Sequence, residues 1–108
     1  MVPKSKYVKA VTAATATDVV VTSASTNSTV MSIIVANTHA TINAEVLLTI
    51  TNDSDVVQST ILPETIIVGK DNYFYEVHFN LPAEYKVKIT SNVTHVDITS
   101  SWTEFASA

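Results

Sequence analysis

The sequence predicts an all-β protein: a single antiparallel β-sandwich of about eight strands with either a jelly-roll or an immunoglobulin-like arrangement. Three observations support this class. Short segments rich in valine, isoleucine and threonine alternate between apolar and polar residues, as strands with one buried face do. Turn-forming segments separate them at a spacing of about ten residues. No segment combines the length and the periodicity of an amphipathic helix.

The chain has 108 residues, which is enough for one domain with its own hydrophobic core. It contains no cysteine, a composition typical of proteins that fold in a reducing compartment. Its net charge is −4, and all its cationic side chains are lysines. Because arginine is the side chain best suited to phosphate and to guanine edges, we expect no nucleic-acid partner. We expect neither export nor a membrane partner, because no signal-peptide pattern and no membrane-spanning segment is evident.

The N-terminal segment differs from the rest of the chain in charge. Lys4, Lys6 and Lys9 all precede the first acidic residue, Asp18. We predict that residues 1–6 form an extended N-terminal arm ahead of a β-sandwich domain over residues 7–108. Because the rest of the chain is acidic, these lysines could lie on the acidic surface of a neighbouring subunit. A solvated terminus is the alternative interpretation.

The strands are expected in the following order. Residues 7–22 carry a weak strand pattern and residues 23–28 a turn composition. Residues 29–36 and 44–51 flank a polar break and predict a β-hairpin. The remaining predicted strands cover residues 56–62, 65–68, 73–79, 85–90 and 94–102.

The predicted hairpin contains two apolar residues that break its alternation. Odd-numbered residues 31–35 of the first strand and even-numbered residues 44–50 of the second are expected to face the core. Ile34 and Leu47 fall on the opposite faces. We predict that they meet across the ladder and form an interface patch against a symmetry mate or a shell protein.

Two further segments carry specific expectations. The turn over residues 69–72 contains the single glycine, Gly69, which we expect to supply a positive φ. In the strand over residues 73–79, the odd-numbered residues keep the phase of the core, whereas Phe74 lies on the opposite face. An aromatic platform for sugar is the alternative to core packing here, and Phe74 is its best candidate.

No group of residues predicts a catalytic or metal site. His95 and Asp97 share a strand face and could hold a metal ion or form a general base, but an exposed salt bridge is the simpler interpretation. The acidic turn at residues 52–55 lacks the glycine and the terminal glutamate of a calcium loop. We therefore expect no enzymatic activity, no metal and no cofactor.

Several segments, taken in order, resemble a known class of proteins. They are the strand ending at residues 33–37, the alternating strand over residues 44–50, the Leu-Pro-Ala-Glu turn at residues 81–84 and the closing residues 101–104. This order resembles small β-sandwich virion structural proteins of tailed bacteriophages.

The resemblance implies a non-enzymatic capsid decoration (cement) protein. Such a protein would be homo-oligomeric, would bind the major capsid protein or other virion proteins, and would reside in a virion assembled in the host cytoplasm. A neck, tail or fibre component that binds carbohydrate or a receptor is the alternative. An extracellular adhesin or pilin-like subunit is a third interpretation, which the missing export signal disfavours.

Overall fold

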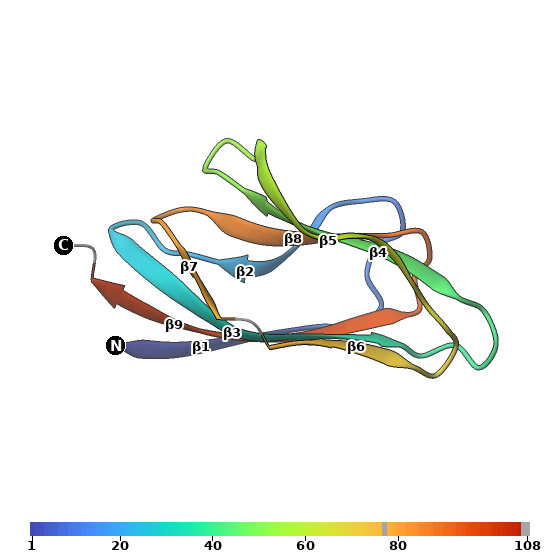
Figure 1. Ribbon diagram of the computed structural model, residues 1–108. Coiled ribbons are helices and arrows are strands. Elements are labelled where there is room, and N and C mark those ends of the chain that lie inside the picture. Colours follow the sequence, from blue (N-terminus) through green and yellow to red (C-terminus); the bar gives the residue numbers. More distant parts are fainter. Residues whose placement is uncertain (77, 107–108) are drawn as a thin grey trace.

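The computed structural model describes residues 1–76 and 78–106 of the chain. Two antiparallel sheets pack face to face, which confirms the predicted β-sandwich, and the described residues contain no helix (Figure 1). The strands are β1 (Val2–Val8), β2 (Thr17–Val21), β3 (Thr26–Asn37), β4 (Ala44–Thr51), β5 (Val57–Ile67), β6 (Asn72–Tyr75), β7 (Phe79–Leu81), β8 (Lys86–Ser91) and β9 (Val96–Ala106).

The strand order is that of a jelly roll. The five-stranded sheet has the order β1-β9-β3-β6, with β7 also paired to β3, and the four-stranded sheet has the order β2-β8-β4-β5. β6 and β7 follow one another along the same edge of β3. Counted as one interrupted strand, they give two four-stranded layers with jelly-roll connectivity. Of the two arrangements that the sequence left open, the jelly roll is therefore the observed one.

The hairpin predicted from residues 29–51 is wrong. Its two strands exist, but β3 lies in the five-stranded sheet and β4 in the four-stranded sheet, so the chain crosses between layers after Asn37. The buried Asn37 amide holds this crossing, because its Nδ2 donates to the carbonyl oxygens of Ile42 at 2.9 Å and Ile67 at 2.8 Å. Alternation shows which face of a strand is buried, but it does not identify the neighbouring strand.

The predicted core phase of β3 is wrong at Val30 and Met31, because the strand contains a β-bulge. The pairing of β3 with β9 shifts between Val30 and Ser32, so Met31 is an extra residue on its strand. Val30 is consequently fully buried, whereas Met31, which we expected in the core, is 37% exposed. Ile33 and Val35 lie beyond the bulge and are buried as predicted. The bulge also lies opposite the break between β6 and β7.

The strand β5 is one continuous element where we predicted two. It contains Pro63, which is tolerated because β5 is the edge strand of its sheet. Its first half is exposed on both faces, and the end of the β4–β5 hairpin projects from the sandwich (Figure 1). Three register shifts along its pairing with β4 accompany this strong bend.

The core lies between the sheets and confirms most of the predicted strand phases. Tyr73 and Tyr75 pack against it from β6, whereas Val77, expected on the same face, lies outside the described residues. Its fully or almost fully buried apolar residues are Val11, Val19, Val20, Val30, Ile33, Val35, Ala44, Val46, Leu48, Leu62, Ile67, Leu81, Val87, Ile89, Val96, Ile98 and Trp102.

The single glycine does not have the positive φ that we expected. In the turn after β5 the left-handed conformation belongs to Lys70, with φ of 61°. A Cβ atom on Gly69 would lie 2.8 Å from the carbonyl oxygen of Ala40 and 2.8 Å from the backbone nitrogen of Thr41. Glycine is therefore required here because two loops pass too close together for a side chain.

The predicted N-terminal arm is part of the sandwich. Residues 2–8 form β1, which pairs with β9 from Val2↔Glu104 to Val8↔Ile98. The expected boundary between an arm at residues 1–6 and a domain from residue 7 thus falls inside one strand. As an edge strand, β1 is mostly exposed, so its side chains lack the apolar alternation by which strands are recognised.

Candidate interaction surface

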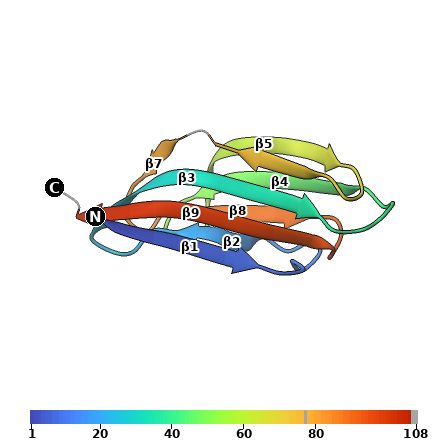
Figure 2. The same cartoon turned by 90° about the horizontal axis from the view of Figure 1, so that it is seen from below.

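A row of four side chains crosses the outer face of the five-stranded sheet. Cross-strand pairing places Tyr7 beside Thr99, Thr99 beside Ile34, and Ile34 beside Phe74. Their sequence neighbours in β3 and β9, such as Ile33 and Ile98, are buried, so the row faces outward. Figure 2 looks onto this side of the molecule, where β1, β9 and β3 lie next to one another.

The two ends of the row are aromatic and solvent-accessible. Tyr7 is 75% exposed on β1, and Phe74 is 51% exposed on β6. Ile34 between them is half-buried. Because neighbouring strands are about 4.8 Å apart, three strand spacings separate the aromatic ends of the row by about 14 Å.

The rest of this face consists almost entirely of uncharged residues. Among the described outward residues of its strands, Asp97 is the one charged side chain, and its Oδ1 accepts a hydrogen bond from the Ala10 backbone at 2.9 Å. Glu76, which is exposed just after β6, adds a second charge at the edge of the face. The surrounding residues are Pro3, Ser5, Asn27, Thr29, Met31, Ser32, Ala36, Asn72, Asn80, Ser101, Thr103 and Phe105.

Several polar groups on this face hydrogen-bond to one another. The hydroxyl oxygens of Ser32 and Ser101 are 2.9 Å apart across β3 and β9. The Thr29 hydroxyl donates to Asn80 Oδ1 at 2.7 Å across β3 and β7. Such paired groups remain satisfied when water is removed, so a partner can cover them at low cost in free energy.

The outer face of the four-stranded sheet is charged instead. Lys88 Nζ lies 2.7 Å from Asp18 Oδ1 and 3.5 Å from Asp55 Oδ1, and Lys86 Nζ lies 3.3 Å from the same Asp55 oxygen. The hydrogen bond with Lys86 and the charges of both lysines lower the pKa of Asp55. The hydrogen bond from Lys88 to Asp18 outweighs desolvation and raises the pKa of Lys88. This cluster attaches the projecting end of the β4–β5 hairpin to β8.

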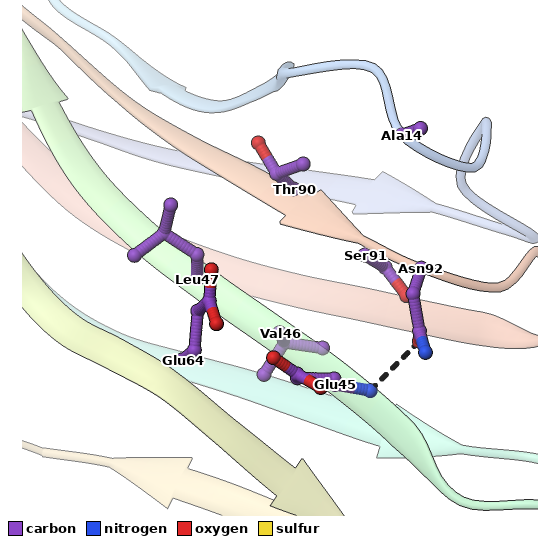
Figure 3. Close-up of a pocket in the computed structure, with 8 residues that line it drawn as sticks. All are labelled: Ala14, Glu45, Val46, Leu47, Glu64, Thr90, Ser91 and Asn92. Atoms are coloured by element: carbon purple, nitrogen blue, oxygen red, sulfur yellow. Dashed lines mark hydrogen bonds between the residues drawn. The ribbon is translucent and has the colours of Figure 1, made fainter.

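Leu47 borders a shallow cavity of about 240 Å³ on this second face (Figure 3). The cavity is bounded by β4, β8, Glu64 of β5 and the loop at Ala14. The Glu45 backbone N–H donates to Asn92 Oδ1 at its rim, at 2.8 Å. A side-chain hydrogen bond with Glu64 and the negative charge of Glu64 raise the pKa of Glu45.

Ile34 and Leu47 do not form the patch that we predicted. Both point outward and are half-buried, as their phase required, but they lie on the outer faces of different sheets. The prediction depended on the hairpin pairing of β3 with β4, which the fold does not contain. Ile34 instead neighbours Phe74 and Thr99, and Leu47 neighbours Thr90.

The three N-terminal lysines have different environments. Lys4 Nζ lies 3.7 Å from the buried carboxylate of Glu104 within the same chain. Lys6 is half-buried opposite Ser100, and Lys9 is exposed in the loop after β1. Their contact with a neighbouring subunit remains a prediction. Glu104, which the sequence analysis did not single out, could have been identified from its inward phase two residues after Trp102.

Two of the three histidines, His39 and His95, hold loops in place. His39 Nδ1 accepts hydrogen bonds from the backbone N–H groups of Thr41 at 3.1 Å and Ile42 at 3.0 Å. His95 Nδ1 lies 2.8 Å from Asn37 Oδ1, an oxygen that can only accept, so this nitrogen carries a proton. Within residues 1–76 and 78–106, no group of three or more His, Cys, Asp or Glu side chains could hold a metal ion.

The comparisons with known proteins give no family assignment: no protein-family profile, curated protein or solved structure matches this chain. The part of the chain that the structure describes contains no helix long and apolar enough to span a membrane.

Proposed function

We propose that this chain is a non-enzymatic structural protein of a bacteriophage particle and that it decorates the capsid surface. The supporting observation is the outer face of the five-stranded sheet, which carries few charges and has Tyr7, Ile34 and Phe74 in one row. The buried centres of protein interfaces are depleted in charge and enriched in aromatic residues. This face therefore has the composition of a surface that another protein covers, namely the major capsid protein, another virion protein or another copy of the chain.

The fold class supports the proposal by analogy. Jelly rolls occur in viral capsid proteins and in lectins, and the same fold hosts unrelated functions. The resemblance of the sequence to small virion proteins of tailed phages agrees with the first of these groups. The analogy with lectins agrees with the alternative of a glycan-binding module.

Quantitative peptide mass spectrometry of purified particles of the virus that encodes the sequence tests the proposal. A copy number comparable with that of the major capsid protein is expected for a decoration protein. A small fraction of that number would place the chain in the neck, tail or fibre instead. Absence of the chain from purified particles would contradict a structural role.

Matched variants identify the surface that attaches the protein to the particle. Phe74→Asp places a charge on the outer face of the five-stranded sheet and should reduce particle occupancy. Ile66→Asp introduces the same charge at a 63% exposed position of the other sheet and should leave occupancy unchanged. If both variants occupy the particle as the wild type does, attachment uses a different surface.

A second candidate function is glycan binding by the same face. The exposed rings of Tyr7 and Phe74, with the Thr99 hydroxyl and Ile34 between them, could stack against sugar rings of an extended neutral glycan. A glycan array in which binding is lost on Phe74→Ala would favour this function over protein attachment. A blank array for a folded protein would exclude the glycans tested.

A further inference from the structure

We propose that the outer face of the five-stranded sheet packs against the same face of a second copy. The two copies are related by a two-fold axis that runs parallel to the strands between β9 and β3. This inference rests on the proposed function in taking that face as the association surface, and it names the partner. Two properties of the face support a second copy as the occupant: its charge and its size.

The charge distribution favours contact through this face. Each copy carries a net charge of −4, so two copies repel one another unless the surfaces that meet are neutral. The outer face of the four-stranded sheet carries Asp18, Glu45, Glu64, Lys86 and Lys88. The described outward strand residues of the five-stranded sheet include one charge, that of Asp97, which lies two residues from Thr99 in β9 and is already hydrogen-bonded. Glu76, exposed just after β6, adds one negative charge at the edge of the face.

The size of the face matches that of a stable dimer interface. β3 has 12 residues and β9 has 11, whereas β1 has 7 and β6 and β7 have 4 and 3. With a rise of about 3.3 Å per residue and a strand spacing of about 4.8 Å, these strands present roughly 590 Å². This footprint is close to the roughly 600 Å² per partner at the lower end of specific, stable interfaces.

The proposed axis determines which residues of the row meet across the interface. Tyr7 lies at one end of the row and Phe74 at the other, with the axis between the central Thr99 and Ile34. The two-fold operation reverses the row, so Tyr7 of one copy lies over Phe74 of the other, and Ile34 lies over Thr99. The interface is therefore isologous and contains two identical aromatic pairs.

The distance between packed sheets permits these pairs. Stacked sheets are about 10 Å apart, and aromatic pairs form with ring centroids about 4.5–7 Å apart. Rings projecting from both sheets can therefore meet between them. The hydroxyl groups of Ser32, Ser101 and Thr29 already have hydrogen-bond partners on their own sheet, so packing leaves them satisfied.

Sedimentation equilibrium of the purified chain tests the inference with a charge-exchange pair. The wild-type protein should show a reversible monomer–dimer equilibrium. Tyr7→Lys alone and Phe74→Glu alone should each weaken it by about tenfold or more, because each variant removes one ring from both aromatic pairs and removes two charges from water. The double variant should recover dimerisation, because each introduced lysine lies opposite an introduced glutamate of the other copy.

The rescue cannot arise within one chain. Positions 7 and 74 are three strands apart, about 14 Å, which is too far for a direct ion pair. Ile66→Glu on the other sheet is the matched control and should dimerise as the wild type does. If either single variant fails to fold by circular dichroism, Thr99→Lys, at the exposed centre of the row, replaces it and should also weaken the dimer.

The possible outcomes separate this inference from the proposed function. A wild-type protein that stays monomeric at millimolar concentration, or a double variant no better than the single ones, overturns the inference. If such a monomer still binds particles through Phe74, the proposed function stands and the partner is a different virion protein. A wild-type dimer, together with dimerisation restored in the double variant, supports the inference even if the chain is absent from virus particles.

Discussion

The carboxylate of Glu104 accepts two hydrogen bonds from Ser23, one from the backbone N–H at 2.7 Å and one from the hydroxyl at 3.1 Å. Glu104 is buried in β9, and Ser23 follows β2, so this contact joins the two sheets at one end of the sandwich. The ammonium of Lys4 in β1 lies 3.7 Å from the same carboxylate. Three segments that are distant in sequence thus meet at one buried acid.

This contact predicts a specific dependence of stability on pH. Burial alone would raise the pKa of Glu104, but the hydrogen bonds from Ser23 and the charge of Lys4 outweigh it and lower the pKa. A lowered pKa means that the folded state gains stability above the unfolded value of about 4.3 and loses it as pH falls through the folded pKa. Glu104→Gln should therefore cost about 1–3 kcal/mol at pH 7.

Urea denaturation at several pH values checks this prediction. The difference in unfolding free energy between wild type and Glu104→Gln should shrink as the pH is lowered below about 4. Ser23→Ala should remove part of the same effect, since it deletes the hydroxyl donor and retains the backbone donor. A difference that is constant over the whole pH range would contradict a role for the charge of Glu104.

The sequence predicted the fold class and most strand phases, because alternation reports burial directly. Val87 and Ile89 are buried while Lys86 and Lys88 point outward, as their spacing required. The bulge at Met31 was not predictable, since one inserted residue leaves the composition of a strand unchanged.

The association surface was only partly predictable. Phe74 was recognised as the outward aromatic of its strand, and Ile34 as out of phase, but their contact with each other depends on strand neighbours that periodicity does not encode. Tyr7 was not recognised as part of the same row, because it joins the row through the pairing of β1 with β9, and these strands are at opposite ends of the chain.

The bulge in β3 predicts different effects on stability for substitutions of the adjacent residues Val30 and Met31. Val30→Ala removes a fully buried side chain and should cost about 1–3 kcal/mol. Met31→Ala alters an exposed side chain and should change the unfolding free energy by no more than about 0.5 kcal/mol. Chemical denaturation measures both. A larger loss of unfolding free energy for Met31→Ala would indicate that Met31 lies in the core and would contradict the bulge.

In the turn after β5, Gly69 is required because there is no space for a side chain, whereas Lys70 has the positive φ. Substitutions of these two residues should therefore have different effects. Gly69→Ala should cost about 1–3 kcal/mol, because the added methyl group meets backbone atoms of Ala40 and Thr41. Lys70→Gly should change stability by less than about 1 kcal/mol, because relief of the positive φ offsets the greater freedom of the unfolded chain. Thermal unfolding of both variants tests this contrast. If Gly69→Ala is neutral, the two loops are not in close contact.

The ion-pair cluster around Asp55 should restrain the projecting hairpin. Because its lowered pKa comes from Lys86 and Lys88, Asp55→Asn should loosen the end of the hairpin and leave the core intact. Amide hydrogen exchange near residues 52–57 should become faster, with exchange of core amides unchanged. Acidification through the folded pKa of Asp55 should have the same local effect on the wild type. Unchanged exchange at the hairpin would show that the ion pairs do not restrain it.

The central claim is that two copies of the protein associate through the outer face of the five-stranded sheet. The most direct measurement is an amide and methyl NMR spectrum recorded over a dilution series. We expect concentration-dependent shifts at Tyr7, Ile34, Phe74 and Thr99, with resonances of the other sheet, such as that of Ile66, unchanged. Shifts confined to the four-stranded sheet, or none at any concentration, would contradict the claim.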